Sequence, residues 1–221
     1  PMFSPLGRLF LIAALRLGGG GAPAVAAQTA EPDGALYPVK VWSEEVRFDL
    51  ARTDQNRLEL ALQFANRRMA EIQNQFALGE VPDEALQLRL QNQLELALRL
   101  AKNYTGQKDV IVVEHGYHGN TQGCVDISSY KFDGPGGQGA PPHVHVTPLP
   151  DAFRGRYRGN TPETGAQYAG HVGAAAEQIR QAGRKPAAFI CESVISCGGQ
   201  VTLPPGYLRE ACRFVRAAGG L

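Results

Sequence analysis

Three short apolar runs in the second half of the chain constrain its fold more than any other feature. They are "DVIVVEH" (109–115), "PHVHVTPL" (142–149) and "KPAAFICES" (185–193). Apolar runs of this length, bounded by glycine, proline and polar residues, are typical of buried strands. A helical pattern from Tyr168 to Ile179 precedes the third run and should end near Gly183, and a final helix should begin at Pro205. The order strand, loop, strand, helix, strand, helix predicts a mainly parallel α/β sheet.

Residues 37–104 have a different, helical pattern. Apolar residues recur there in alternating steps of four and three, at Leu58, Leu62, Ala65, Met69, Ile72 and Phe76. A second stripe consists of Leu86, Leu90, Leu94, Ala97, Leu98 and Ala101. Such stripes form the buried faces of helices and carry no chemistry of their own. The sequence therefore predicts an N-terminal helical hairpin, with residues 54–78 packed antiparallel against residues 83–103.

Local signals set the ends of these two helices. Thr53 or Asp54 can cap the start of the first helix, and Gly79 can end it. Pro82 and Asp83 are suited to open the second. The connection is short, which favours an antiparallel arrangement.

The first thirty residues are distinct from both halves. Arg8 precedes an apolar run, Leu9–Leu15, which is followed by Gly18–Gly21 and by "APAVAAQTA". This pattern predicts a degraded signal peptide or membrane anchor, with a disordered tail as the alternative. The run is too short to span a bilayer. We therefore expect three parts: a leader or tail at 1–34, a helical domain at 35–95 and an α/β domain at 96–221.

Charge and cysteine spacing argue against nucleic-acid binding and against a zinc ribbon. The formal net charge is +1, and lysines and arginines are interspersed with acidic residues, so no basic stripe suggests nucleic-acid binding. The four cysteines form no CxxC pair. A zinc ribbon is therefore disfavoured, and reduced core thiols are expected.

A cluster of polar aromatic residues follows the first strand. His115, Tyr117 and His118 are interleaved with glycines directly after the run Val110–Val113. Open α/β sheets bind ligands at the carboxyl ends of their strands. This turn is therefore predicted to form one wall of a ligand site.

The helical half resembles a known family. The stretch "LYPVKVWSEEVRFDLARTDQNRLELALQFANRRMAEIQNQ" is similar to DUF5667, a helical domain of bacterial exported or membrane-anchored proteins, over residues 35–95. The resemblance implies an extracytoplasmic, non-enzymatic helical module.

The α/β half resembles the class III pyridoxal-phosphate aminotransferases. The segments that carry the resemblance are "LALRLAKNYTGQKDVIVVEHGYHGNTQGCVDISSYKF", "HVTPLPDAFRGRYRG" and "AAFICESVISCGGQVTLPPGYLREACRFVRAAGG". Within that class the "DISSYKF" and "PLPDAFRG" segments are most similar to alanine–glyoxylate aminotransferase-like proteins and ethanolamine-phosphate phospho-lyases. The resemblance implies the large domain of a type I pyridoxal-phosphate transferase, a small amine or amino-acid substrate, and a homodimer for the complete enzyme.

The resemblance also implies site residues. Tyr117 would stack on the pyridine ring, and His118 would sit beside the ring or turn outward. Gly119 would let the backbone approach the cofactor, and Glu192 would face the cofactor pocket. Ser193 and Cys197 depart from the commoner "EPVQGEGG" form of the family, which favours the phospho-lyase-like branch.

Three anchors that the family implies for the cofactor are not found among these residues. No lysine follows Lys185, the aspartate of a "DEV" motif is absent, and residues 89–93 read "RLQNQ" where a glycine-containing phosphate cup is expected. Lys102, Lys108 and Lys131 are the substitute lysines to consider, Lys131 first. We therefore expect a composite chain, joined within residues 94–101, whose enzyme part is incomplete and inactive alone.

Several alternatives remain beside this interpretation. The chain could be a non-enzymatic extracytoplasmic module carrying an α/β remnant, and its two halves point to different compartments, cytoplasmic and exported.

His143 and His145 form an HxH pair that could bind zinc with His115 and His118, although no acidic ligand is spaced with them. Cys191 or Cys197 could act with a histidine as a hydrolase, but Cys191 lies in an apolar strand. Glu192 could simply end a strand in solvent.

Overall fold

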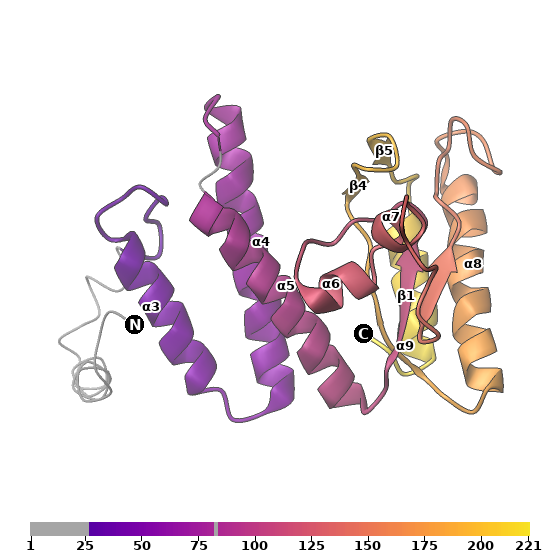
Figure 1. Ribbon diagram of the computed structural model, residues 1–221, viewed down its shortest axis with the longest axis horizontal. Coiled ribbons are helices and arrows are strands. Elements are labelled where there is room, and N and C mark those ends of the chain that lie inside the picture. Colours follow the sequence, from indigo (N-terminus) through magenta and orange to yellow (C-terminus); the bar gives the residue numbers. More distant parts are fainter. Residues whose placement is uncertain (1–26, 82–83) are drawn as a thin grey trace. The chain divides into compact units, whose positions relative to one another are not determined.

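The computed structural model describes residues 27–81 and 84–221 (Figure 1). The chain divides into two compact units, residues 1–90 and residues 91–221. Most of the predicted leader, and the predicted helix start at Pro82 and Asp83, lie outside the described residues. None of the helices in the described ranges combines the length and the hydropathy needed to cross a membrane.

The first unit is helical, as predicted. It contains α3 (Tyr37–Asp49), α4 (Asp54–Ala77) and the first residues of α5 (Glu84–Thr105). Thr53 caps α4, because its Oγ1 accepts a hydrogen bond of 3.1 Å from the backbone N–H of Asn56. Gly79 follows α4 with a φ of +77°, a left-handed conformation that glycine adopts at helix ends without strain.

The predicted buried seam of α4 is partly wrong. Leu58 and Ala65 are buried, but Leu62 and Met69 are 47% and 43% exposed. Arg68 lies on the buried face instead, fully inaccessible to solvent. The spacing of apolar residues predicted the wrong face because it treats every charged residue as exposed. Charged residues that pair with one another can nevertheless be buried.

A network of paired charges fills the interior of the first unit. Arg68 donates to Glu44 Oε1 at 3.0 Å and lies 3.1 Å from Glu71 Oε1. Lys40 Nζ lies 2.8 Å from Glu71 Oε1. The Tyr37 hydroxyl accepts from Arg68 at 2.6 Å and donates to Glu71 Oε2 at 2.8 Å. Each charge is thereby compensated, which burial in a low-dielectric interior requires.

The second unit is built on a parallel three-stranded sheet of order β2-β1-β3. The strands are β1 (Asp109–Val113), β2 (Val144–Thr147) and β3 (Pro186–Phe189). This confirms the predicted mainly parallel sheet, although the third strand ends before Cys191. Beyond the end of β3, the backbone N–H of Ile190 still donates to Ile111 O at 3.0 Å.

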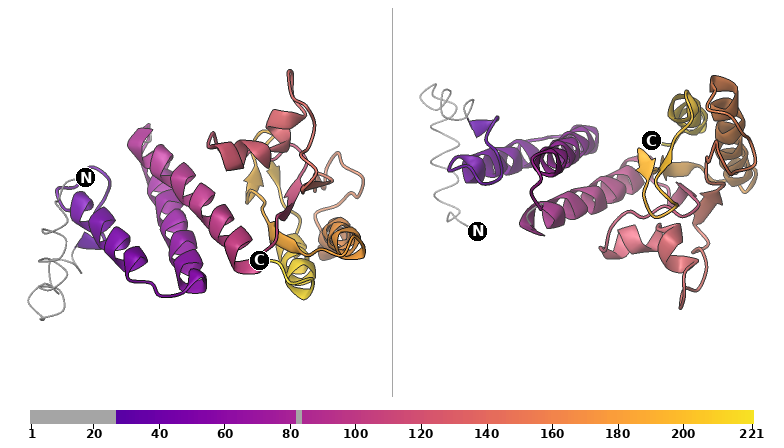
Figure 2. Two further views of the ribbon diagram at one scale, coloured as in Figure 1. Left: turned by 60° about the horizontal axis from the view of Figure 1, so that its bottom comes forward. Right: turned by 90° about the horizontal axis from the view of Figure 1, so that it is seen from above.

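The residues of β1 alternate between two hydrophobic cores. Ile111 and Val113 belong to a core built with α8 (Pro162–Gln181) and α9 (Tyr207–Ala217), whereas Val110 and Val112 face a second core. That second core contains Leu98, Ile127, Phe132 and Val144. Successive strand residues point to opposite faces, so a strand covered on both faces is apolar throughout. Figure 2 shows α8 and α9 on one side of the sheet.

Four short elements of the second unit were not predicted. They are α6 (Gln122–Asp126), α7 (Ser129–Phe132) and the antiparallel pair β4 (Val194–Ile195) and β5 (Val201–Thr202). The final helix begins at Tyr207 rather than at Pro205, after Gly206 with a φ of +80°. Leu98 shows that part of the predicted leucine stripe of α5 packs into the sheet core.

Candidate functional site

The candidate site begins where β1 ends, at the carboxyl edge of the sheet. His115 has a φ of +60°, and the backbone N–H of Gly116 donates to Val113 O at 3.0 Å, so the chain turns sharply. A left-handed conformation costs a non-glycine residue about 1–3 kcal/mol. A side chain at position 116 would place its Cβ 2.9 Å from Val113 O, which explains the glycine. The turn is thus held in a tight and strained form.

Glu192 joins this turn to the segment that follows β3. Its Oε1 accepts a hydrogen bond of 2.9 Å from the backbone N–H of Tyr117. Its Oε2 accepts from the hydroxyl of Ser196 at 2.8 Å and from the Ser196 backbone N–H at 3.2 Å. The predicted approach of Tyr117 and Glu192 at the carboxyl edge of the sheet is confirmed.

Neighbouring side chains hold the ring of Tyr117. Its hydroxyl donates to Asn120 Oδ1 at 2.7 Å, and the edge of Tyr130 meets it with centroids 6.1 Å apart. The ammonium of Lys131 lies 5.5 Å from the ring centroid, within the range of a cation–π contact. Burial raises the pKa of the Tyr117 phenol, which therefore stays protonated at neutral pH. The site presents a fixed, half-buried aromatic ring.

His118 points into the protein rather than outward. Its side chain is buried, its backbone N–H donates to Ser128 Oγ at 2.9 Å, and its Nε2 has no hydrogen-bond partner within the described residues. Burial lowers the pKa of His118 to about 4, against a smaller opposing effect of Glu192. The imidazole is therefore neutral at physiological pH and supplies no proton there.

Gly119 follows His118 in a backbone conformation that favours glycine. Its φ is +117°, a conformation that disfavours any side chain. A Cβ at this position would meet Gln91 Cγ at 3.4 Å and Cys124 Cβ at 3.8 Å. Glycine is thus needed here for the backbone conformation, on the side of the turn that packs against α5 and α6.

Sequence reasoning missed the polar residues that support the turn. Asn120, Ser128 and Ser196 bond to Tyr117, His118 and Glu192, respectively. Another carboxylate, Glu95 Oε2, accepts from Thr121 Oγ1 at 2.7 Å. Only the fold brings these residues together, because no spacing in the sequence relates them to the turn.

The histidines of the zinc alternative do not converge. His143 and His145 lie at the amino end of β2, whereas His115 and His118 follow the carboxyl end of the parallel strand β1. His145 Nε2 lies 2.7 Å from Asp109 Oδ1. Within the described ranges, no three His, Cys, Asp or Glu residues are grouped so as to hold a metal ion.

The cysteine of the hydrolase alternative is not activated. Burial raises the pKa of the Cys191 thiol to about 12, and its Sγ donates to Glu192 O at 3.2 Å. A thiol with a raised pKa forms little thiolate at neutral pH and is a poor nucleophile. Cys197 is exposed, and within the described residues no hydrogen bond joins its thiol to a histidine that could act as a general base.

Two family models match the chain, one over each half. Residues 91–221 match the family model of class-III aminotransferases. Residues 29–116 match the model of a domain of unknown function, DUF5667, so the two matches overlap in α5 and β1.

Individual relatives match the same part of the chain. It is 42% identical over 130 residues to the alanine–glyoxylate aminotransferase 2-like protein of Drosophila melanogaster, covering 58% of this chain and 26% of that protein. It is 40% identical over 136 residues to ethanolamine-phosphate phospho-lyase homolog 1 of Caenorhabditis elegans, covering 58% and 29%. The chain thus spans between a quarter and a third of these relatives.

The fold is also found in solved structures. An amine transaminase from an uncultivated Pseudomonas species, solved with pyridoxal phosphate bound, aligns with a TM-score of 0.50 at 22% identity, covering 59% of this chain and 31% of that chain. The family to which these proteins belong depends on pyridoxal phosphate. Because the family model matches more than half of its residues, the chain belongs, through residues 91–221, to the class-III aminotransferase family.

Proposed function

We propose that residues 91–221 form one wall of a pyridoxal-phosphate site, in which Tyr117 and Glu192 contact the cofactor ring. The reaction class is amino-group transfer or elimination on small amines. The observation that supports this most strongly is the 2.9 Å hydrogen bond from the Tyr117 backbone N–H to Glu192 Oε1. It fixes an aromatic ring and a carboxylate at the sheet edge where α/β enzymes bind ligands.

The residues of this wall fit a flat heteroaromatic ring. Tyr117 is anchored at its hydroxyl by Asn120 and at its edge by Tyr130, so little side-chain entropy is lost on stacking. The ammonium of Lys131 brings positive charge close to the same ring. Pyridoxal phosphate, when bound, supplies the electron sink for breaking bonds next to an amine nitrogen. The chain's own residues orient that ring.

The described residues do not supply a phosphate cup where the family implies one. Residues 89–93 lie inside α5, where backbone N–H groups bond within the helix and are not available to a phosphate. No lysine follows Lys185 in the sequence. We therefore propose that these 221 residues by themselves do not catalyse transamination or phosphate elimination.

The finer assignment favours the phospho-lyase-like branch. Ser193 and Cys197 replace a proline and a glutamate of the commoner family form, and Ser196 bonds Glu192 in the same segment. The relatives that support this assignment are named as an aminotransferase-like protein and as a phospho-lyase homolog. Elimination of phosphate from a small amine is thus our first choice, and amino transfer is the second.

The second candidate function is a non-enzymatic binding role for the first unit. This unit matches DUF5667, and its ionic network is contained within residues 37–71. A self-contained, compensated interior of this kind is suited to a helical module that acts by binding. This candidate predicts that the first unit contributes nothing to cofactor binding.

Titration with pyridoxal phosphate, followed by absorbance, tests the proposed site. We expect weak binding, near the millimolar range or about −4 kcal/mol. Replacing Tyr117 by alanine should weaken binding by roughly 2- to 12-fold, which corresponds to a stacking contribution of about 0.5–1.5 kcal/mol. Tyr104→Ala is the control, because Tyr104 is an exposed tyrosine on α5. An affinity that is the same in both variants would contradict the proposal.

A further inference from the structure

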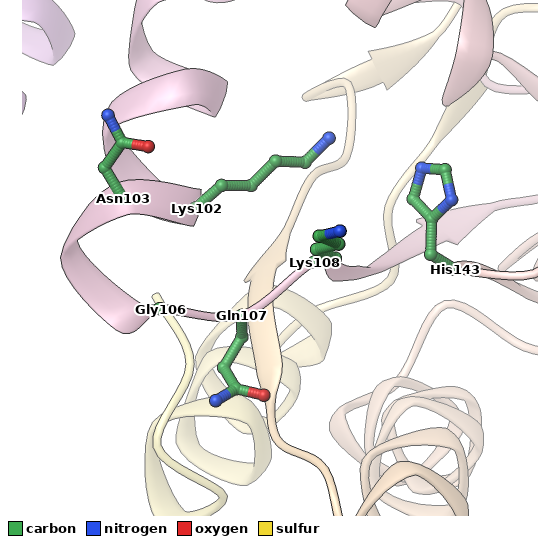
Figure 3. Close-up of a pocket in the computed structure, with 6 residues that line it drawn as sticks. All are labelled: Lys102, Asn103, Gly106, Gln107, Lys108 and His143. Atoms are coloured by element: carbon green, nitrogen blue, oxygen red, sulfur yellow. The ribbon is translucent and has the colours of Figure 1, made fainter.

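A cavity of about 510 Å³ lies at the other edge of the sheet, around the amino end of β1 (Figure 3). It is lined by Lys102, Asn103, Gly106, Gln107, Lys108 and His143. Lys102 and Asn103 come from the last turns of α5, Lys108 directly precedes β1, and His143 directly precedes β2. Cavities of this volume hold small organic ligands.

The lining of this cavity carries two positive charges and no carboxylate. Within the described residues, neither Lys102 nor Lys108 is ion-paired. The buried acid that follows Lys108 in the chain, Asp109, is already compensated, with its Oδ1 2.7 Å from His145 Nε2 and 2.9 Å from Arg184. The two ammonium charges are therefore free to act on a ligand.

The carboxyl end of α5 would ordinarily oppose an anion there, because its last carbonyl groups carry partial negative charge. Here two of the last four carbonyls of α5, those of Lys102 and Asn103, accept hydrogen bonds. Thr105 Oγ1 donates to Ala101 O at 2.8 Å and to Lys102 O at 3.4 Å, and the Gly106 N–H donates to Asn103 O at 3.3 Å. Gly106 turns the chain away from the helix with a φ of +64°. The negative pole at this helix end is consequently reduced.

The pKa of His143 responds to the positive charge in the cavity. Burial and the charge of Lys102 lower its pKa, while Asp126, Asp109 and His145 act on it more weakly. Figure 3 shows the Lys102 side chain extending from α5 toward the side where Lys108 and His143 lie. A neutral imidazole can still donate one hydrogen bond to an anion.

We propose that this cavity binds the phosphate group of a soluble phosphate monoester. Lys102 and Lys108 hold the phosphate as point charges, His143 donates to it, and Asn103 and Gln107 bond the polar remainder of the ligand. The cavity exceeds what a phosphate alone would fill, which favours a monoester. The site lies at the edge of β1 opposite to Tyr117, so it does not depend on the proposed cofactor wall.

Calorimetric titration of the 221-residue chain with glycerol 3-phosphate tests this site. Lys102→Gln and Lys108→Gln should each weaken binding by about tenfold, the loss expected for one charge-assisted hydrogen bond. Arg209→Gln removes a positive charge from the exposed first turn of α9, which does not line this cavity, and should change the affinity less than about twofold. Circular dichroism of each variant checks that the fold is kept.

Nuclear magnetic resonance of His143 supplies an independent measurement. A bound dianion stabilises the imidazolium, so the pKa of His143 should rise on saturation with glycerol 3-phosphate. The absence of saturable binding, or an equal loss of affinity in Arg209→Gln, would overturn the proposal. Binding to phosphatidate-containing vesicles without binding of glycerol 3-phosphate would overturn it as well, because the phosphate source would then be a membrane.

Discussion

The backbone N–H of Tyr117 and the carboxylate of Glu192, which lie 75 positions apart in the sequence, are joined by a hydrogen bond of 2.9 Å. The same carboxylate accepts two hydrogen bonds from Ser196. Glu192 thus connects the turn after β1 with the segment after β3, and the orientation of Tyr117 depends on it.

Removal of the Glu192 carboxylate should loosen both segments. Glu192→Ala leaves the N–H groups of Tyr117 and Ser196 without their acceptor, and we expect a loss of about 1.5–3 kcal/mol in the free energy of unfolding. Glu192→Gln keeps one acceptor oxygen and should lose less. Urea unfolding measures both, with Glu177→Gln, on the exposed face of α8, as the control. Equal stability of the alanine variant and the native chain would show that the link is not needed.

Breaking the ionic network of the first unit should unfold it more readily than altering the face predicted from the sequence. Arg68→Ala leaves Glu44 and Glu71 buried with less compensation, which costs about 3–5 kcal/mol when one partner of a buried pair is removed. Leu62→Asp and Met69→Asp place a charge at exposed positions and should change stability by about 0.5 kcal/mol or less.

Thermal unfolding followed by circular dichroism compares these three variants. Strong destabilisation by Leu62→Asp or Met69→Asp, with little effect of Arg68→Ala, would restore the apolar seam as the buried face of α4.

The lowered pKa of His118 should make stability depend on pH. The pKa is about 4 in the folded protein and about 6.5 in an unfolded chain. Between these values the unfolded state binds more protons, so the free energy of unfolding falls as the pH decreases from about 6.5 to about 4. The difference between the two pKa values of His118 corresponds to roughly 3 kcal/mol in the free energy of unfolding. His118→Gln removes the titrating group, and its stability should change less over this range.

Unfolding by urea at several pH values measures this difference. An identical pH dependence in the native chain and in His118→Gln would show that His118 titrates normally.

The sequence predicted the sheet better than the helical unit. Ile111 and Val112 lie in opposite cores, and a strand buried on both faces is recognisable as an uninterrupted apolar run. The face of α4 could not be found in this way, because Arg68 and Glu71 are buried through pairing and not through hydropathy. The hydrogen bonds that Ser129 and Tyr130 of α7 make to the turn depend on tertiary contacts that no local pattern encodes.

Part of the candidate site was also predicted from the apolar strands. Tyr117 and Glu192 each follow an apolar strand, and parallel strands bring such positions to one edge. The orientation of His118 was left open by the sequence, since a histidine between glycines can point either way. Ser128, which bonds its backbone, lies ten positions farther along the chain.

The central claim is that Tyr117 holds a pyridoxal-phosphate ring, and borohydride reduction followed by peptide mass spectrometry tests it most directly. At about 1 mM pyridoxal phosphate, near the expected Kd, Lys131 should be labelled in preference to Lys185, because its ammonium lies 5.5 Å from the Tyr117 ring centroid. Tyr117→Ala should remove that preference, while labelling at micromolar cofactor should stay well below one lysine per chain. Equal labelling of Lys131 and Lys185 in the native chain would contradict the proposed wall, and stoichiometric labelling of one lysine at micromolar cofactor would contradict the proposed lack of activity.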